Sequence, residues 1–191
     1  MQDVKIIIGV VAVLLTFVGY IPYLRDTIKT KTKPHIYSWF IWGFITIIAF
    51  ALQTGGGAGV GALVTLAAAI VCFVIFFLGL RNGDKDITTM DTIFFIAALV
   101  AIGIWLFVKQ PLISVVLVSV IDVLGFIPTI RKSWHRPNSE TLFTYLLNTF
   151  RHGLSILALQ RYTIITSLYP IVWTIANGLF SLMLVVRRKQ M

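Results

Sequence analysis

Seven long apolar stretches, joined by short polar connections, dominate this sequence and restrict the folds that it can adopt. The hydrocarbon core of a membrane is roughly 30 Å thick, so a spanning helix needs about 20 mainly apolar residues. The apolar runs lack the alternation of β-barrel strands, which favours helices. The stretches are Ile6–Leu24, His35–Gln53, Gly55–Leu80, Thr89–Val108, Pro111–Ile130, Thr141–Leu159 and Tyr162–Val186. The sequence therefore predicts an all-α membrane protein with seven transmembrane helices.

The composition leaves no room for a sizeable soluble domain. Of the 191 residues, 58% are hydrophobic and 12% are charged, whereas soluble domains are typically about half apolar and about a quarter charged. The N-terminus has neither a basic leader nor a small-residue cleavage site, so we expect the first stretch to be a membrane helix and not a signal peptide. The single cysteine, Cys72, excludes an intramolecular disulfide.

The net charge of +9 is distributed unevenly over the two faces of the predicted membrane. One face carries Arg25, Lys29, Lys31, Lys33, Arg81, Lys85, Arg131, Lys132, Arg136, Arg187, Arg188 and Lys189, and the other carries Lys5, Lys109 and Arg161. Lys and Arg concentrate in the cytoplasmic loops of membrane proteins. We therefore expect a cell-membrane protein with the N-terminus outside and the C-terminus in the cytoplasm. This asymmetry explains the basic charge without a nucleic-acid partner.

An internal repeat divides the chain. Residues Gly19–Arg25 read Gly-Tyr-Ile-Pro-Tyr-Leu-Arg, and residues Gly125–Arg131 read Gly-Phe-Ile-Pro-Thr-Ile-Arg. The copies lie on the first and fifth predicted helices, so both run through the membrane in the same direction. Three helices per unit would invert the second copy, and one additional helix restores the parallel orientation. We therefore expect a 3+1+3 arrangement, with a first three-helix repeat at 1–81, a linker helix at 82–109 and a second three-helix repeat at 110–191.

These motifs resemble the SWEET/SemiSWEET and PQ-loop superfamily of membrane transporters. The residues that carry the resemblance are Gly19-x-x-Pro22, Lys31-Thr32-Lys33, Ser38-x-x-x-Trp42, Gly125-x-x-Pro128 and Thr141-x-x-x-Tyr145. Transporters of this family are built from parallel repeats. The resemblance implies that Pro22 and Pro128 act as hinges and that Trp42, Tyr145 and Asn177 line a pocket. The chain departs from the family where the glutamine after each motif proline is replaced by Tyr23 or Thr129.

Polar residues gather at one depth on three of the predicted helices. At 1.5 Å per residue, Asp122 and Arg151 each lie about 18 Å from the cytoplasmic loop, and Asn177 lies about 15 Å from Arg187. Charged groups at this depth mark functional sites by default. At about 100° per residue, Asn148, Arg151 and His152 share one face of their helix, and Trp173 shares a face with Asn177. The candidate substrate-binding residues are Trp42, Asp122, Tyr145, Asn148, Arg151, His152, Trp173 and Asn177.

Each candidate also has a structural interpretation. Asp122 and Arg151 could form a buried ion pair between the fifth and sixth helices. His152 could carry a proton or only donate a hydrogen bond to a neighbour, and the two motif prolines could be static kinks. Of the tryptophans, Trp39, Trp105 and Trp134 are expected to be interfacial anchors.

The functional prediction follows from this constellation. We find no pattern of a catalytic nucleophile and base, no cluster of metal ligands and no phosphate-binding loop, so we expect neither an enzyme nor a cofactor. The alternative of an intramembrane active site using Asp122 and His152 stays open. We expect a transporter that moves a small polar solute by alternating access at a midplane site, in the bilayer of a bacterial inner membrane. The other alternative is a receptor or scaffold that does not transport, and an oligomer is compatible with either.

Overall fold

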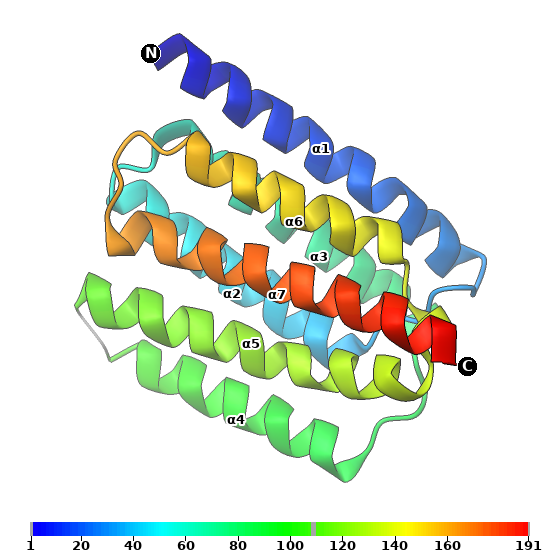
Figure 1. The fold of residues 1–191 in the computed structure, drawn as a ribbon. Coiled ribbons are helices and arrows are strands. Elements are labelled where there is room, and N and C mark those ends of the chain that lie inside the picture. The colour runs from blue at the N-terminus through cyan, green and yellow to red at the C-terminus, as the bar shows by residue number, and fades with distance from the viewer. Residues whose placement is uncertain (1, 108–109, 191) are drawn as a thin grey trace.

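The computed structural model describes residues 2–107 and 110–190, and this part of the chain contains seven α-helices (Figure 1). Their bounds are α1 Gln2–Ile28, α2 Ile36–Gly55, α3 Leu63–Asn82, α4 Thr89–Trp105, α5 Pro111–His135, α6 Leu142–Leu157 and α7 Ile164–Gln190. Two short 3-10 helices, η1 Gly59–Ala62 and η2 Pro137–Ser139, precede α3 and α6. The prediction of an all-helical protein is confirmed. The predicted fourth stretch ends at Val108, which, like Lys109, lies outside the described residues.

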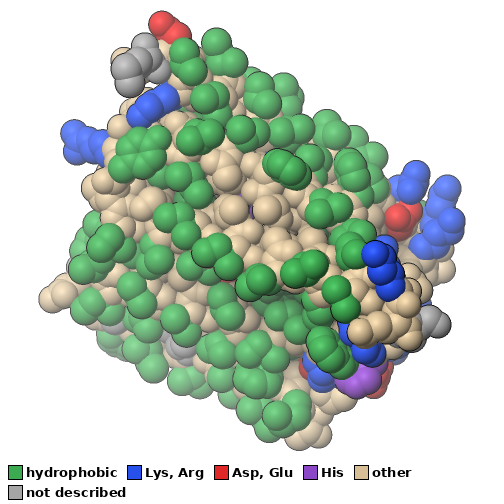
Figure 2. Space-filling model, viewed as in Figure 1, with side chains coloured by type: hydrophobic (Ala, Val, Ile, Leu, Met, Phe, Trp, Pro, Cys, Tyr) green, Lys and Arg blue, Asp and Glu red, His purple; other side chains and the backbone are tan. Residues whose placement is uncertain are grey.

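Five of the helices, α1, α2, α3 joined to η1, α5 and α7, are long and apolar enough to cross a membrane. Helix α4 is apolar but has 17 residues, and α6 has 16 residues and carries Arg151 and His152. Figure 2 shows hydrophobic side chains over the flank of the bundle and Lys and Arg side chains at its ends. Large apolar side chains such as Leu14 on α1 and Leu179 on α7 are 59% and 63% exposed. A contiguous apolar belt of this kind suits a membrane.

We call α1, α2 and α3 the first group and α5, α6 and α7 the second group, and α4 lies at one edge of the bundle. Helices α1 and α2 both pack on α3, and α5 and α6 both pack on α7. Between the groups, α1 packs on α6 and α2 packs on α5. Helix α4 lies along α5 and also touches α2, as Figure 1 shows at the edge of the bundle. The residues around 29–35, 83–88 and 136–141 share one end of the bundle with the C-terminus, and we call it the basic end.

Two apolar surface grooves occupy equivalent places in the two groups. One runs between α1 and α3 and the other between α5 and α7. The α1 wall of the first groove consists of Val10, Val13, Leu14 and Phe17, and the α5 wall of the second includes Val116, Ser119, Val120 and Val123. When the offset between Gly19 and Gly125 is added to the number of each of these four α1 residues, the result is the number of one of the four α5 residues. The register of the sequence repeat is therefore also the register of the packing.

The two motif glycines lie where the groups touch. A β-carbon at Gly19 would lie 2.8 Å from Cδ2 of Leu147 on α6, and a β-carbon at Gly125 would lie 2.8 Å from Cγ2 of Ile41 on α2. The hydroxyl of Thr144 on α6 donates to the carbonyl oxygen of Gly19 at 2.9 Å. Real β-carbons do not approach neighbours this closely, so the absence of a side chain permits both crossings.

The motif prolines lie inside their helices and not at the ends. Helix α1 continues from Pro22 to Ile28, and α5 continues from Pro128 to His135. Both helices therefore extend beyond the apolar stretches of the sequence, which stop at Leu24 and Ile130. Proline cannot donate the backbone hydrogen bond to the residue four positions before it, so each helix has a weak point about one turn after its glycine crossing.

We predict that Gly125→Ala destabilises the protein by about 1–3 kcal/mol, because the new methyl group overpacks against a buried part of Ile41. Gly153→Ala on α6 is the matched control: its β-carbon would meet nothing within 4 Å, so stability should stay unchanged or rise by up to about 1 kcal/mol. Thermal unfolding in detergent measures both. Equal melting temperatures for the two variants would show that the α2–α5 crossing is not tight.

Candidate functional site

A small enclosed cavity of about 30 Å³ lies in the middle of the bundle. Its walls come from α1, α2, α3, α6 and α7, and its most exposed lining residue, Trp173, is only 7% exposed. The lining residues are Tyr20, Trp39, Trp42, Thr46, Ala68, Cys72, Tyr145, Asn148, Arg151, His152, Tyr169, Trp173 and Asn177. A water molecule needs roughly 10–15 Å³ of such volume. The cavity therefore has space for a few atoms and is closed at both ends.

The structure brings the residues singled out from the sequence to this one place. Seven of the eight line the cavity: Trp42, Tyr145, Asn148, Arg151, His152, Trp173 and Asn177. The eighth, Asp122, lies behind two of them. The indole nitrogen of Trp173 donates to the carboxylate of Asp122, and the indole nitrogen of Trp42 donates to its carbonyl oxygen at 3.3 Å. Two helices from different groups therefore hold Asp122 at the wall of the cavity.

Arg151 is held by neighbours on α6 and α1. Its Nε donates to the side-chain oxygen of Asn148 at 2.7 Å, and the amide nitrogen of Asn148 donates to the hydroxyl of Tyr20 at 3.1 Å. The guanidinium also lies over the ring of Tyr20, 5.6 Å from its centroid. Within residues 2–107 and 110–190, no ion pair joins Arg151 to Asp122. The interpretation of these two residues as a buried ion pair is wrong.

Four side chains around the cavity have a buried polar atom without a hydrogen-bond partner in the described part of the chain. These atoms are Oδ1 of Asp122, Nη1 of Arg151, Nδ1 of His152 and Oδ1 of Asn177. The second polar atom of two of these side chains has a partner. The amide nitrogen of Asn177 donates to the Trp173 carbonyl at 2.7 Å, and Oδ2 of Asp122 accepts from the Trp173 indole. Buried polar atoms nearly always have partners. Arg151, His152 and Asn177 line the cavity, and their three unpaired atoms therefore suit a polar ligand.

Sequence reasoning missed several aromatic and hydroxyl residues of the wall. Trp39, expected as an interfacial anchor, is 1% exposed and donates to the hydroxyl of Tyr23 at 3.2 Å, so that prediction is wrong. Thr46 and Tyr169 join α2 to α7 through their hydroxyls at 3.1 Å. Tyr20 belongs to a buried face of α1 with residues spaced three and four apart, and this spacing was the signal that could have found it.

The other two predicted anchors lie toward the ends of their helices. Trp134 is 48% exposed at the basic end, with the guanidinium of Arg187 4.8 Å from its ring centroid. This position suits an interfacial anchor. The side chain of Trp105 lies outside what the structure describes.

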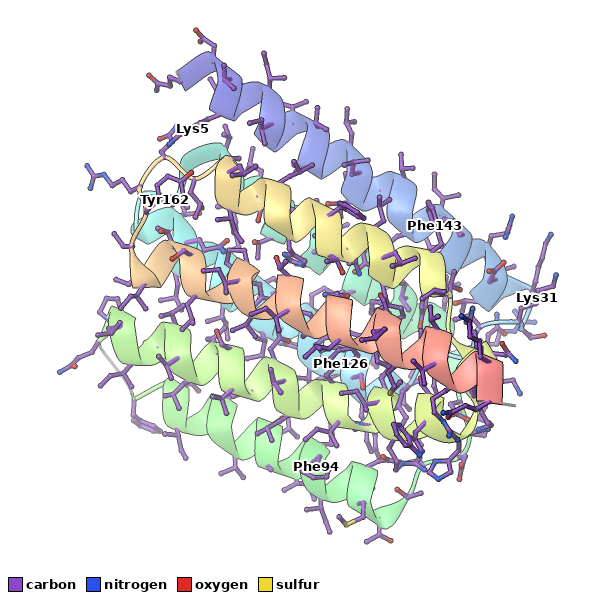
Figure 3. The ribbon with its side chains drawn as sticks, in the orientation of Figure 1. Lys5, Lys31, Phe94, Phe126, Phe143 and Tyr162 are labelled. Carbon is purple, nitrogen blue, oxygen red and sulfur yellow. The ribbon has the colours of Figure 1, made fainter. Side chains whose placement is uncertain are left out.

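Several layers close the cavity toward the basic end. The first is aromatic: Phe126 packs on Phe180 at 4.8 Å between ring centroids, and Tyr145 packs on Phe180 at 4.5 Å. Figure 3 places Phe126 inside the bundle. The second layer is a fully buried ion pair between Lys132 and Glu140. The hydroxyl of Tyr145 donates to Glu140 at 2.9 Å, so one side chain links the cavity wall to this ion pair.

Beyond the ion pair, a pocket opens at the basic end between α1 and α6. Its lining includes Arg25, Lys31, Glu140 and Arg188, and Figure 3 shows Lys31 at that end. Glu140 therefore borders this pocket and also binds Tyr145, which borders the cavity. The Lys132–Glu140 pair and Tyr145 form the partition between the two spaces.

The closure at the opposite end is apolar. Ala58, Ala62 and Leu159 form a separate buried cluster there. The amino group of Lys5 donates to the carbonyl oxygen of Leu159 at 2.6 Å and lies 4.9 Å from the ring centroid of Tyr162, and Figure 3 shows these two labelled side chains close together. No buried ion pair lies in this layer among the described residues.

Comparisons with protein-family models, with curated proteins and with solved structures found no match to this chain. The resemblance to the SWEET and PQ-loop superfamily therefore stays a prediction from the motif residues. The search for metal sites found no group of three His, Cys, Asp or Glu side chains that could hold an ion, over the described residues. The functional argument therefore depends on the geometry of the cavity.

The buried ion pair gives a sharp prediction. Lys132→Met and Glu140→Gln should each destabilise the protein by about 3 kcal/mol, because each leaves one buried charge unpaired. The double variant should recover most of this loss, since no uncompensated charge remains. Chemical unfolding in detergent over the double-mutant cycle measures the coupling. Purely additive losses would mean that the two charges do not interact.

Proposed function

We propose that this protein is an integral membrane transporter that moves a small polar solute by alternating access at the central cavity. The observation that carries the proposal is the cavity itself, which is enclosed, lies at mid-helix and is lined by both groups of three helices. Three residues of its lining, Arg151, His152 and Asn177, have unpaired polar atoms that offer donors and acceptors to a solute. Ligand sites in repeat-built transporters lie near the membrane midplane where the repeats meet.

The proposal includes a 3+1+3 arrangement of SWEET-like and PQ-loop-like type. The first repeat contains α1, α2 and α3, the linker is α4, and the second repeat contains α5, α6 and α7. Three observations support it: the packing pairs of one group recur in the other, the two surface grooves share one register, and each motif glycine contacts the second helix of the other group. Helix α4 packs along α5 and α2 at the edge, as a linker would.

Alternating access would then open one end of the cavity while the other stays closed. Pro22 and Pro128 are proposed hinges, because each follows a glycine crossing and weakens its helix on the side of the basic end. Bending there would separate α1 from α6 or α5 from α2 and would pull the partition apart. The Lys132–Glu140 pair is the proposed gate at that end.

An enzymatic role for Asp122 and His152 is not part of this proposal. The carboxylate of Asp122 accepts a hydrogen bond from Trp173, and the imidazole of His152 lies 6.3 Å from that indole between ring centroids. Trp173 therefore contacts both side chains from within the same wall. The proposal assigns both groups to solute binding.

The second candidate function, a receptor or scaffold, takes its support from the basic pocket. Arg25, Lys31 and Arg188 line that pocket together with Asp26 and Glu140, and a peptide or a headgroup could bind there. Such a ligand would contact the basic end and would not reach the central cavity. Binding that depends on Lys31 but not on Asn177 would favour this alternative.

For orientation we propose a bacterial inner membrane with the basic end in the cytoplasm and the N-terminus outside. The partners are the bilayer and the solute. The charge asymmetry between the ends supports this orientation, and the apolar belt supports insertion.

The transport proposal predicts that a small polar solute raises the melting temperature of the detergent-purified protein. A ligand at 100 times its dissociation constant stabilises by about 2.7 kcal/mol. The screen covers sugars, amino acids, vitamins and organic acids. Asn177→Ala should abolish the shift, whereas Leu179→Ala, which changes a 63% exposed residue on the same helix, should retain it. A folded protein that responds to no solute would contradict transport.

The orientation is testable by cysteine labelling. In a Cys72→Ala background, Arg161→Cys and Lys31→Cys place single thiols on exposed positions at opposite ends. An impermeant maleimide added to intact bacterial cells that express the protein should label Arg161→Cys at once and Lys31→Cys only after lysis. The reverse pattern would invert the proposed topology.

A further inference from the structure

Arg151 stands out in the cavity wall as a buried charge without a counter-charge. Arg151 is 2% exposed, and the arginine side chain stays protonated in proteins. Its polar contact is the neutral side chain of Asn148, and Nη1 has no partner in the part of the chain that the structure describes. The aromatic ring of Tyr20 covers the guanidinium on one side. An unpaired charge at membrane depth is costly, and the wall does not compensate it.

Among residues 2–107 and 110–190, no acidic side chain forms an ion pair with Arg151. Asp122, the carboxylate beside the cavity, is bonded to Trp173 on the other wall. Glu140 is occupied by Lys132 and Tyr145 in the partition. The acidic side chains Asp84 and Asp91 are bound to Arg136 and Arg131 at the basic end. In the described part of the chain Arg151 therefore has no partner of opposite charge within ion-pair distance, and a ligand in the cavity can supply one.

We infer that the solute carries a carboxylate, which binds the free edge of the Arg151 guanidinium. This inference rests on the proposed function and narrows the class of solute. Guanidinium and carboxylate form short, charge-assisted hydrogen bonds in a fixed geometry. Arg151 lines the cavity and its Nη1 has no partner among the described residues, so a carboxylate in the cavity can accept a hydrogen bond from Nη1.

The rest of the wall adds a second requirement. The unpaired oxygen of Asn177, which lines the cavity, is an acceptor, so the solute also presents a hydrogen-bond donor, as a hydroxy acid or an amino acid does. A neutral sugar would leave Arg151 uncompensated, and an amine without a carboxylate would add repulsion between like charges. A cavity of about 30 Å³ favours a solute of few atoms and requires the repeats to separate when it enters.

The test is isothermal titration calorimetry of the full chain in detergent, in a chloride-free buffer. The probes are sodium lactate, alanine, glucose, ethanolamine and sodium chloride. We expect lactate or alanine to bind, and glucose, ethanolamine and chloride not to bind. Arg151→Gln should weaken the binding about ten- to hundred-fold, because this change in affinity corresponds to the free energy of one hydrogen bond to a charged group. Arg151→Lys, which keeps the charge, should retain more of the affinity than Arg151→Gln.

Stability separates this role from a structural one. Arg151→Gln removes an unpaired buried charge, so its melting temperature without ligand should equal or exceed that of the wild type. A fall in melting temperature together with unchanged binding would overturn the inference, because Arg151 would then be a structural residue.

The outcomes also separate this inference from the transport proposal. If glucose or ethanolamine binds and Asn177→Ala abolishes that binding, the proposal of a solute site in the central cavity is kept, but the inference that the solute carries a carboxylate is wrong. If chloride alone binds, an inorganic anion compensates Arg151 and the inference fails. If no probe binds to the folded wild type and no member of the wider solute screen does, transport and the carboxylate fail together.

Discussion

Two helix crossings, α1 on α6 and α5 on α2, hold the groups of three helices together, and the rest of the bundle depends on how closely they approach. In lipid there is no hydrophobic drive between helices, so association depends on close packing and interhelical hydrogen bonds. Gly19 and Gly125 provide the close packing, and the bond from Thr144 to the Gly19 carbonyl adds to it. The cavity lies between the same groups, so these crossings also set the distance between its walls.

Helix α6 shows how a polar segment is accommodated in such a bundle. Its buried face carries Asn148, Arg151 and His152, while Phe143 and Phe150 on the opposite face are 51% and 67% exposed. The polar face is covered by α1 and α7, so its charge meets protein and not lipid. Helix α6, with 16 residues and a polar face, can therefore pack between two long apolar helices.

The helices, the register of the repeat and the level of the polar residues could be predicted from the sequence, because all three follow from periodicity and segment length. The partners of the polar atoms could not. Asp122 and Arg151 lie at equal depth, yet one is bonded to Trp173 and the other to Asn148, since the rotation of each helix about its axis depends on packing. The prediction for Trp39 was wrong for the same reason: Tyr20 and Tyr23 of α1 cover its ring. Glu140 was missed because it lies in a connection whose path the sequence does not specify.

The repeated sequence motif has two similar copies, whereas the two groups contribute different side chains to the cavity. The first group contributes aromatic and small residues such as Trp42 and Ala68, whereas the second contributes Arg151, His152 and Asn177. The closures differ as well: an aromatic layer and a buried ion pair lie toward the basic end, and apolar side chains lie toward the other. A symmetric pore for a large neutral solute would need equivalent walls. Aromatic rings line both walls, but the arginine lies on one of them, so the proposed transporter would hold a small asymmetric solute in one orientation, with its anionic end toward α6.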